Sequence, residues 1–158
     1  MTQIQIDPRG PRFTATVTSA ALAVVLLLPP GPIALAVLAA QTALFALGAA
    51  RGVQHTPLAW VFRTFVRPRL DAPAHLEDPA PPRFAQAVGL LFALVALVGY
   101  ASGATVVGSV ATGLALAAAL LNAVFGFCLG CEIYLLVRRV IPHSHIPSNS
   151  NTKEEVTA

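Results

Sequence analysis

Charged residues are scarce in this chain. They make up 11% of its 158 residues, whereas hydrophobic residues make up 56%, and the mean hydropathy is +0.71. A soluble domain usually carries about 25% charged residues, so this chain has too few charges to cover a surface in contact with water. The scarcity excludes an ordinary soluble domain and indicates that lipid surrounds most of the chain.

Cysteine is rarer still. The only two cysteines, Cys128 and Cys131, stand three positions apart and cannot form the disulfide framework of a small secreted domain.

The net charge of +3 and the pI near 9.4 could suggest a nucleic-acid partner. The arginines flank apolar runs, however, as they do at the cytoplasmic ends of transmembrane helices. No nucleic-acid partner is therefore expected.

Four apolar stretches predict an all-α integral membrane protein with four transmembrane helices. They cover residues 14–30, 33–51, 84–101 and 104–126, and the fourth could extend further. All four lie within a membrane domain of residues 1–142. Each is close to the roughly 20 residues that cross about 30 Å of hydrocarbon. The final run continues to Val137 with Glu132 as its one charge, so it must tilt, kink near residues 126–130, or extend beyond the bilayer.

The segments between the spans predict the orientation. Residues 51–70 mix aromatic side chains with arginines, as helices at the headgroup level do. Residues 71–82 contain four prolines and predict a cytoplasmic linker, and residues 143–158 predict a disordered cytoplasmic tail. The turns near residues 29–32 and 102–103 contain no Lys or Arg, so both termini are expected in the cytoplasm of a multi-pass protein.

A weak internal repeat runs through the chain. Pro11-Arg12-Phe13 precedes the first span, and Pro82-Arg83-Phe84 precedes the third, 71 residues later. The same shift places residues 57–60 on residues 128–131. The order of arginine, span, break, span and basic extension occurs twice, which favours two tandem helical hairpins of parallel topology. A chance match between two apolar hairpins of low complexity is the alternative.

The sequence around the two cysteines carries the most chemistry. A C-x-x-C pair on a helix places both sulfurs on one face, near enough for a disulfide or a soft metal. A helix N-terminus would lower a thiol pKa here only if the helix broke at Gly126 or Gly130. Glu132 would raise that pKa when ionised, or accept a proton. Alternatively, the cysteines pack as small apolar residues, and Gly126 and Gly130 form a G-x-x-x-G face.

Other candidate residues carry less chemistry. A metal site needs more ligands than two thiols, and no second cysteine pair exists, so no metal site and no cofactor are predicted. The remaining ligand types are scattered: His55, His75, Glu132, His143 and His145. Arg12 and Arg83, each followed by phenylalanine, are typical interfacial anchors, and they could also bind phospholipid headgroups or an anionic substrate.

Two motifs carry a resemblance to a known family. D-P-R-x-x-R-F at residues 7–13 and G-F-C-x-G-C-E at residues 126–132 resemble an uncharacterised family of small bacterial membrane proteins, a domain of unknown function. The resemblance extends over about residues 6–142. It implies four helices in the bacterial inner membrane and an association with thioredoxin-like and sulfurtransferase proteins. It names no activity.

The resulting hypothesis is thiol–disulfide or sulfur exchange at Cys128 and Cys131 with a cytoplasmic redox partner, with Glu132 aiding proton transfer. A transport subunit is the first alternative, with Arg12 and Arg83 guarding the mouth of a small-solute path. A structural subunit whose cysteines only pack is the second. The sequence is compatible with a homo-oligomer, and it leaves open whether the protein is an enzyme.

Overall fold

The computed structural model describes residues 5–73 and 75–140. All elements of regular secondary structure in that part of the chain are helices. The long helices are α1 (Arg9–Leu27), α2 (Pro32–Arg51), α4 (Ala80–Ala101) and α5 (Thr105–Leu120), and α5 continues as a wider helical turn, η4 (Leu121–Phe125). All four, α5 together with η4, are long and apolar enough to cross a membrane. The predicted all-α fold with four transmembrane helices is confirmed, and the protein is a multi-pass membrane protein.

Prolines explain where the helix ends differ from the predicted spans. α1 begins at Arg9, earlier than the predicted span. It ends at Leu27, because Pro29 and Pro30 cannot continue the helix. α4 begins at Ala80, so it includes the end of the predicted linker. Proline is well suited to a first helical turn, where its missing N–H would have no partner. The predicted tail, residues 143–158, lies outside the described residues.

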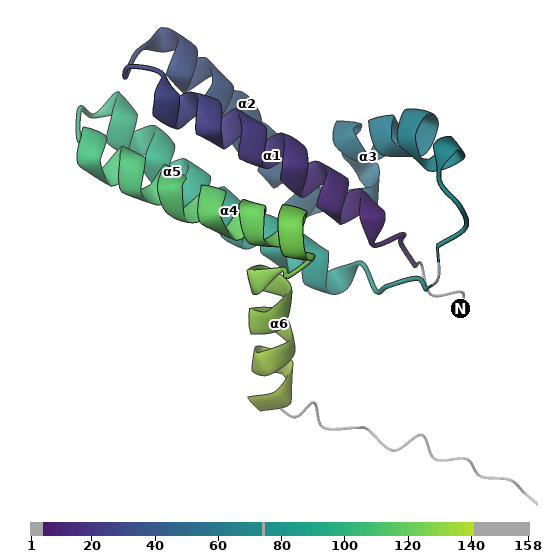
Figure 1. Cartoon of the computed structure of the whole chain (residues 1–158). Helices are drawn as coiled ribbons and strands as arrows, with labels where there is room; N and C mark the ends of the chain where they lie inside the picture. The colour runs from purple at the N-terminus through teal and green to yellow at the C-terminus, as the bar shows by residue number, and fades with distance from the viewer. Residues whose placement is uncertain (1–4, 74, 141–158) are drawn as a thin grey trace, which may run out of the picture.

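The four long helices pack as a ring. α1 contacts α2 and α5, and α4 contacts the same two helices, so the hairpins α1–α2 and α4–α5 lie side by side (Figure 1). All described arginines lie at or beyond the end where α1 and α4 begin, here called the arginine-rich end. The turns at the opposite, charge-free end contain only residues 28–31 and 102–104.

The half of the bundle near the charge-free end is closely packed. Its buried apolar side chains come from all four helices: Leu22, Val25, Leu38, Ala96, Ala111 and Ala115. α4 and α5 approach so closely that a Cβ on Gly99 would lie 2.7 Å from the backbone nitrogen of Gly108. Small residues allow such close contacts between membrane helices, where no water drives the association.

Two helical segments leave the bundle on opposite sides of its arginine-rich end (Figure 1). After α2 come η1 (Val53–His55), α3 (Pro57–Val61), η2 (Phe62–Val66) and η3 (Arg67–Arg69), and after η4 comes α6 (Leu129–Val140). α6 has 12 residues, about 18 Å, and is too short to cross about 30 Å of hydrocarbon. Its mixture of apolar and charged residues suits a helix lying at a membrane surface.

The linker before α4 is held against the start of α1. The N–H of Ile6 donates to the carbonyl of Glu77 at 2.9 Å, and the N–H of Glu77 donates back to Ile6 at 2.9 Å. Farther along, Nη1 of Arg9 donates to the carbonyl of Asp71 at 2.8 Å. These bonds hold the linker against the start of α1 at residues 71 and 77, and the linker contributes side chains to the arginine-rich end.

Candidate functional site

The last apolar run is interrupted immediately before the cysteines. Gly126 ends η4 in the left-handed region with φ of 69°, which glycine adopts without a Cβ clash. α6 then begins at Leu129, and the N–H of Glu132 donates to the carbonyl of Cys128 at 3.1 Å. Cys128 therefore stands at the N-terminus of α6, and Cys131 lies in its first turn.

Both cysteines are free thiols, and each changes the acidity of the other. The Cys131 thiol donates a hydrogen bond to the sulfur of Cys128, and the N–H groups of Gly130 and Cys131 donate to it as well. Together they lower the pKa of Cys128 from 9.0 to about 7, although burial acts in the opposite direction. Near neutral pH, Cys128 is thus available as a thiolate.

Cys131 has the opposite property. Its pKa is raised, first by the hydrogen bond that it gives to Cys128, then by burial and by the negative charges of the Cys128 thiolate, Glu77 and Glu132. Near neutral pH the pair therefore combines a largely available thiolate at Cys128 with a sulfur at Cys131 that keeps its proton, an arrangement suited to thiol–disulfide exchange.

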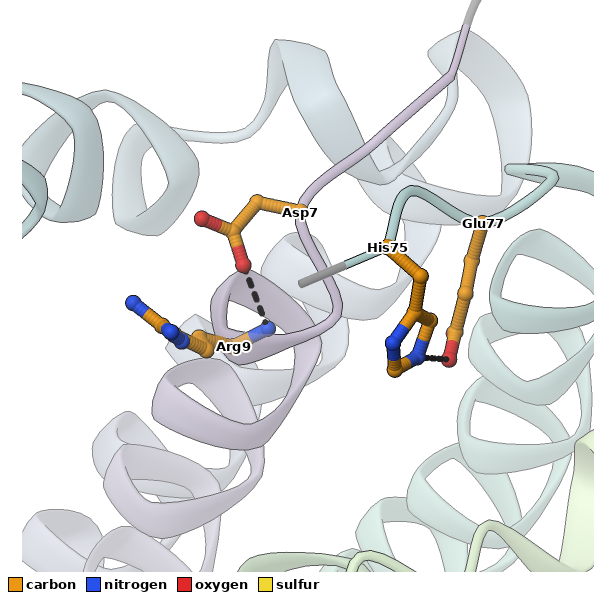
Figure 2. A network of polar contacts seen from close by, with 4 residues as sticks. All are labelled: Asp7, Arg9, His75 and Glu77. Carbon is orange, nitrogen blue, oxygen red and sulfur yellow. Dashed lines mark hydrogen bonds and ion pairs between the residues drawn. The ribbon is translucent and has the colours of Figure 1, made fainter. Parts of the chain in front are cut away.

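A polar cleft of about 670 Å³ opens onto both thiols. Glu132 lines it from α6, Arg12 from α1, and His75 and Glu77 from the linker. Nε2 of His75 lies 3.3 Å from Oε1 of Glu77, and close by the N–H of Arg9 donates to Oδ1 of Asp7 at 3.0 Å (Figure 2). Sequence reasoning missed Glu77 as a neighbour of the cysteines, because charges in a proline-rich linker indicate only a solvated loop.

The two candidate arginines cap helix ends across the bundle. Nε and Nη2 of Arg83 donate to the carbonyls of Ala49 and Ala50, at 2.8 and 2.9 Å. In the same way, Nη2 of Arg12 donates to the carbonyls of Ala123 and Val124, at 3.5 and 3.3 Å. A cation satisfies the last carbonyls of a helix and stabilises the negative end of its dipole. A role in binding lipid or an anionic substrate stays a prediction for both residues.

The two candidate packing glycines play different parts. A G-x-x-x-G face needs one continuous helix, but Gly126 ends the first helix and Gly130 belongs to the next. Only Gly130 brings helices together, since a Cβ at that position would lie 2.6 Å from Cα and Cβ of Ala85 in α4. The pair does not form the shared face that the spacing suggested.

Metal ligands do not gather in the part of the chain that the structure describes. No group of three or more His, Cys, Asp or Glu side chains could hold an ion there. His143 and His145 lie outside the described residues. The ionisable side chains that line the cleft are two thiols, three carboxylates, two arginines and one histidine: Cys128, Cys131, Glu77, Asp78, Glu132, Arg9, Arg12 and His75.

The fold and the cleft define a class: a four-helix multi-pass membrane protein with a free C-x-x-C pair at the start of a short amphipathic helix outside the spans. Residues 6–139 match the family described as a domain of unknown function, DUF4395, and the chain belongs to that family. The resemblance to an uncharacterised family is thereby confirmed. No curated protein and no solved structure matches the chain.

Proposed function

We propose that this protein exchanges disulfides or sulfur through Cys128 and Cys131 with a thioredoxin-like or sulfurtransferase partner in the cytoplasm. The observation that carries the proposal is the placement of the pair. Cys128 receives hydrogen bonds from the N-terminus of α6 and from the Cys131 thiol, and both cysteines line a polar cleft at the arginine-rich end. A pair that served only for packing would need neither feature.

The proposed location is the bacterial inner membrane, with both termini and the cleft on the cytoplasmic side. The distribution of arginine supports this orientation, since every described arginine lies at or beyond one end of the bundle and the turns at the other end carry none. Short cytoplasmic loops concentrate Lys and Arg in this way.

The order of the exchange steps follows from the pKa values of the two thiols, lowered at Cys128 and raised at Cys131. The Cys128 thiolate attacks a disulfide of the partner, which forms a mixed disulfide and releases one partner thiolate. Cys131 then loses its proton to Glu132 or water, and its sulfur attacks Cys128, releasing the second partner thiol. The pair is oxidised by two electrons and the partner is reduced by two. With a persulfide, the first attack would instead transfer the outer sulfur to Cys128.

The test uses the full chain in lipid nanodiscs, with glutathione disulfide as the probe. The reduced protein should lose both thiols and release two glutathione molecules per chain. Cys131→Ala should trap glutathione on Cys128, whereas Cys128→Ala should trap much less, because the pKa of Cys131 is raised. Thiols that stay unreactive until denaturant is added would overturn the proposal and favour the structural or transport subunit.

A further inference from the structure

A cavity of about 320 Å³ lies inside the bundle, in the half nearer the arginine-rich end. All four long helices and the start of α6 line it. Most of its wall is apolar, and the side chains that define it include Thr18, Phe45, Phe92, Ala115 and Ala119. Cys128 and Gly130 border it where α6 begins. Its volume lies at the lower end of the 300–1,000 Å³ that is usual for small-molecule sites.

The rim of this cavity reaches the outer surface of the bundle. Leu114 of α5 and Ile133 of α6 line the cavity, yet 54% and 43% of their surfaces are exposed. Ile133 lies on α6, outside the spans, at the arginine-rich end. Leu114 lies on a membrane-spanning helix, where an exposed apolar side chain faces lipid. An apolar molecule dissolved in the bilayer could therefore enter from the side.

Cys128 borders two compartments of opposite polarity. It lines the apolar cavity within the bundle and also the polar cleft, whereas Cys131 lines only the cleft. A water-soluble partner reaches the cysteine pair through the cleft. The cavity offers a second approach to the same sulfur, open only to molecules that partition into lipid.

We propose that this cavity binds the ring of a lipid-soluble quinone, which takes up the electrons of the Cys128–Cys131 pair. This inference rests on the proposed exchange function. A quinone fits because its ring is flat and apolar, it accepts two electrons at once, and its carbonyl oxygens need hydrogen-bond donors. Two residues that carry side-chain amides, Gln86 and Asn122, are among those that line the cavity.

The electrons and protons balance as follows. The Cys128 thiolate adds to the quinone ring and forms a carbon–sulfur bond. Cys131 gives up its proton, and its sulfur attacks Cys128, so that the sulfur–sulfur bond forms and the carbon–sulfur bond breaks. The ring departs with two electrons as a quinol, taking one proton from Cys131 and one from water in the cleft. The resulting disulfide can then oxidise a thiol partner that enters the cleft.

The experiment measures anaerobic oxidation of the reduced protein in nanodiscs by a short-chain dimethoxybenzoquinone. The expected result is saturable loss of two thiols for each quinone reduced, together with formation of the Cys128–Cys131 disulfide. Wild-type protein that glutathione disulfide oxidises but the quinone does not would overturn the quinone inference and leave the proposed function standing. Protein that neither reagent oxidises would overturn both.

Two alanines of α5 supply a matched pair of variants. Ala119 lines the cavity, whereas Ala117 is exposed on the outer face. Ala119→Leu should slow quinone oxidation about tenfold or more by filling the cavity, and leave exchange with glutathione disulfide unchanged. Ala117→Leu should change neither rate. Equal quinone rates in both variants would show that the quinone reacts elsewhere and would overturn the site.

A photoreactive azidoquinone tests the wild-type protein without any substitution. It should label cavity residues of α4 and α5, and the short-chain quinone should compete for that labelling. Labelling spread evenly over the lipid-facing surface, without competition, would contradict a specific cavity site.

Discussion

The two hairpins share one backbone plan and differ in chemistry. In each, the second helix ends at a glycine with positive φ, Gly52 at 94° and Gly126 at 69°. An arginine from the other hairpin, Arg83 or Arg12, caps that end. A short helical segment then packs an aromatic ring on the first helix of its own hairpin. The ring centroids of Phe13 and Phe62 are 5.8 Å apart, and those of Phe84 and Tyr134 are 5.7 Å apart.

The difference lies at the first residue of the short helices. In the first hairpin, Oγ1 of Thr56 accepts from the N–H of Ala59 at 3.2 Å, a normal N-cap. In the second, the sulfur of Cys128 accepts from the N–H of Cys131. The cysteine pair thus occupies the place of a hydroxyl cap and the residue three positions later. In the first hairpin the residue at this position only caps a helix, whereas in the second hairpin it also carries a thiol of lowered pKa.

The largest expected effect comes from giving the second hairpin the chemistry of the first. Cys128→Ser restores a hydroxyl cap, so the protein should stay folded in nanodiscs while exchange with glutathione disulfide is abolished. Serine accepts from the same N–H groups but cannot form a disulfide. Thiol counting and thermal unfolding report the two properties separately. The matched Thr56→Ser should leave both unchanged, and exchange that survives in Cys128→Ser would remove Cys128 from the mechanism.

The next effect concerns the acidity of Cys128. Cys131→Ala removes the strongest cause of the lowered pKa, so the midpoint of Cys128 alkylation should move up from about 7 towards 9.0. A full return would reduce the thiolate fraction at pH 7 from about one half to about one hundredth. Cys131→Ser keeps a donor and should shift the midpoint less. Equal midpoints in both variants would contradict a hydrogen-bond origin.

The same pKa predicts how stability depends on pH. The pKa of Cys128 is lower in the folded protein than in the unfolded chain, so its ionisation favours the fold. This stabilisation from Cys128 grows as the pH rises from about 7 towards 9 and is lost as the pH falls through 7. Above pH 9 the raised pKa of Cys131 acts in the opposite direction, because the unfolded chain then loses a proton that the folded protein keeps. Cys131→Ala should lose part of this dependence, which thermal unfolding at a series of pH values would measure.

A smaller effect follows from the close contact of α6 with α4. When the two short helices are aligned at their first residues, Pro57 and Leu129, Leu58 corresponds to Gly130. This alignment differs by one residue from the 71-residue shift of the sequence repeat. Gly130→Ala would place a Cβ 2.6 Å from Ala85, and the resulting displacement of α6 should cost about 1–3 kcal/mol and slow exchange. Gly113→Ala is the control, because nothing lies within 4 Å of a Cβ there. Equal unfolding temperatures for the two variants would contradict tight packing at Gly130.

The sequence predicted the membrane helices well, because the length and apolarity of a span follow directly from the thickness of the bilayer. It also indicated the cysteine pair as a candidate site and gave Gly126 or Gly130 as the place where the helix could break. It could not show that the break occurs there, since a tilted continuous helix satisfies the same hydropathy. The sequence also did not predict the contacts of Glu77, Arg12 and Arg83, because they join residues far apart in the chain and leave no periodic pattern.

The smallest expected effect distinguishes the two arginine caps. Arg83 makes two short hydrogen bonds to α2, whereas those of Arg12 to η4 are 3.3 and 3.5 Å long. A cation at a helix C-terminus contributes about 0.3–1 kcal/mol, so Arg83→Ala should lower the unfolding temperature slightly more than Arg12→Ala does. Only Arg12→Ala should change exchange at Cys128, because Arg12 lines the cleft. Slower exchange in Arg83→Ala alone would reverse this assignment and tie the cysteine chemistry to the first hairpin.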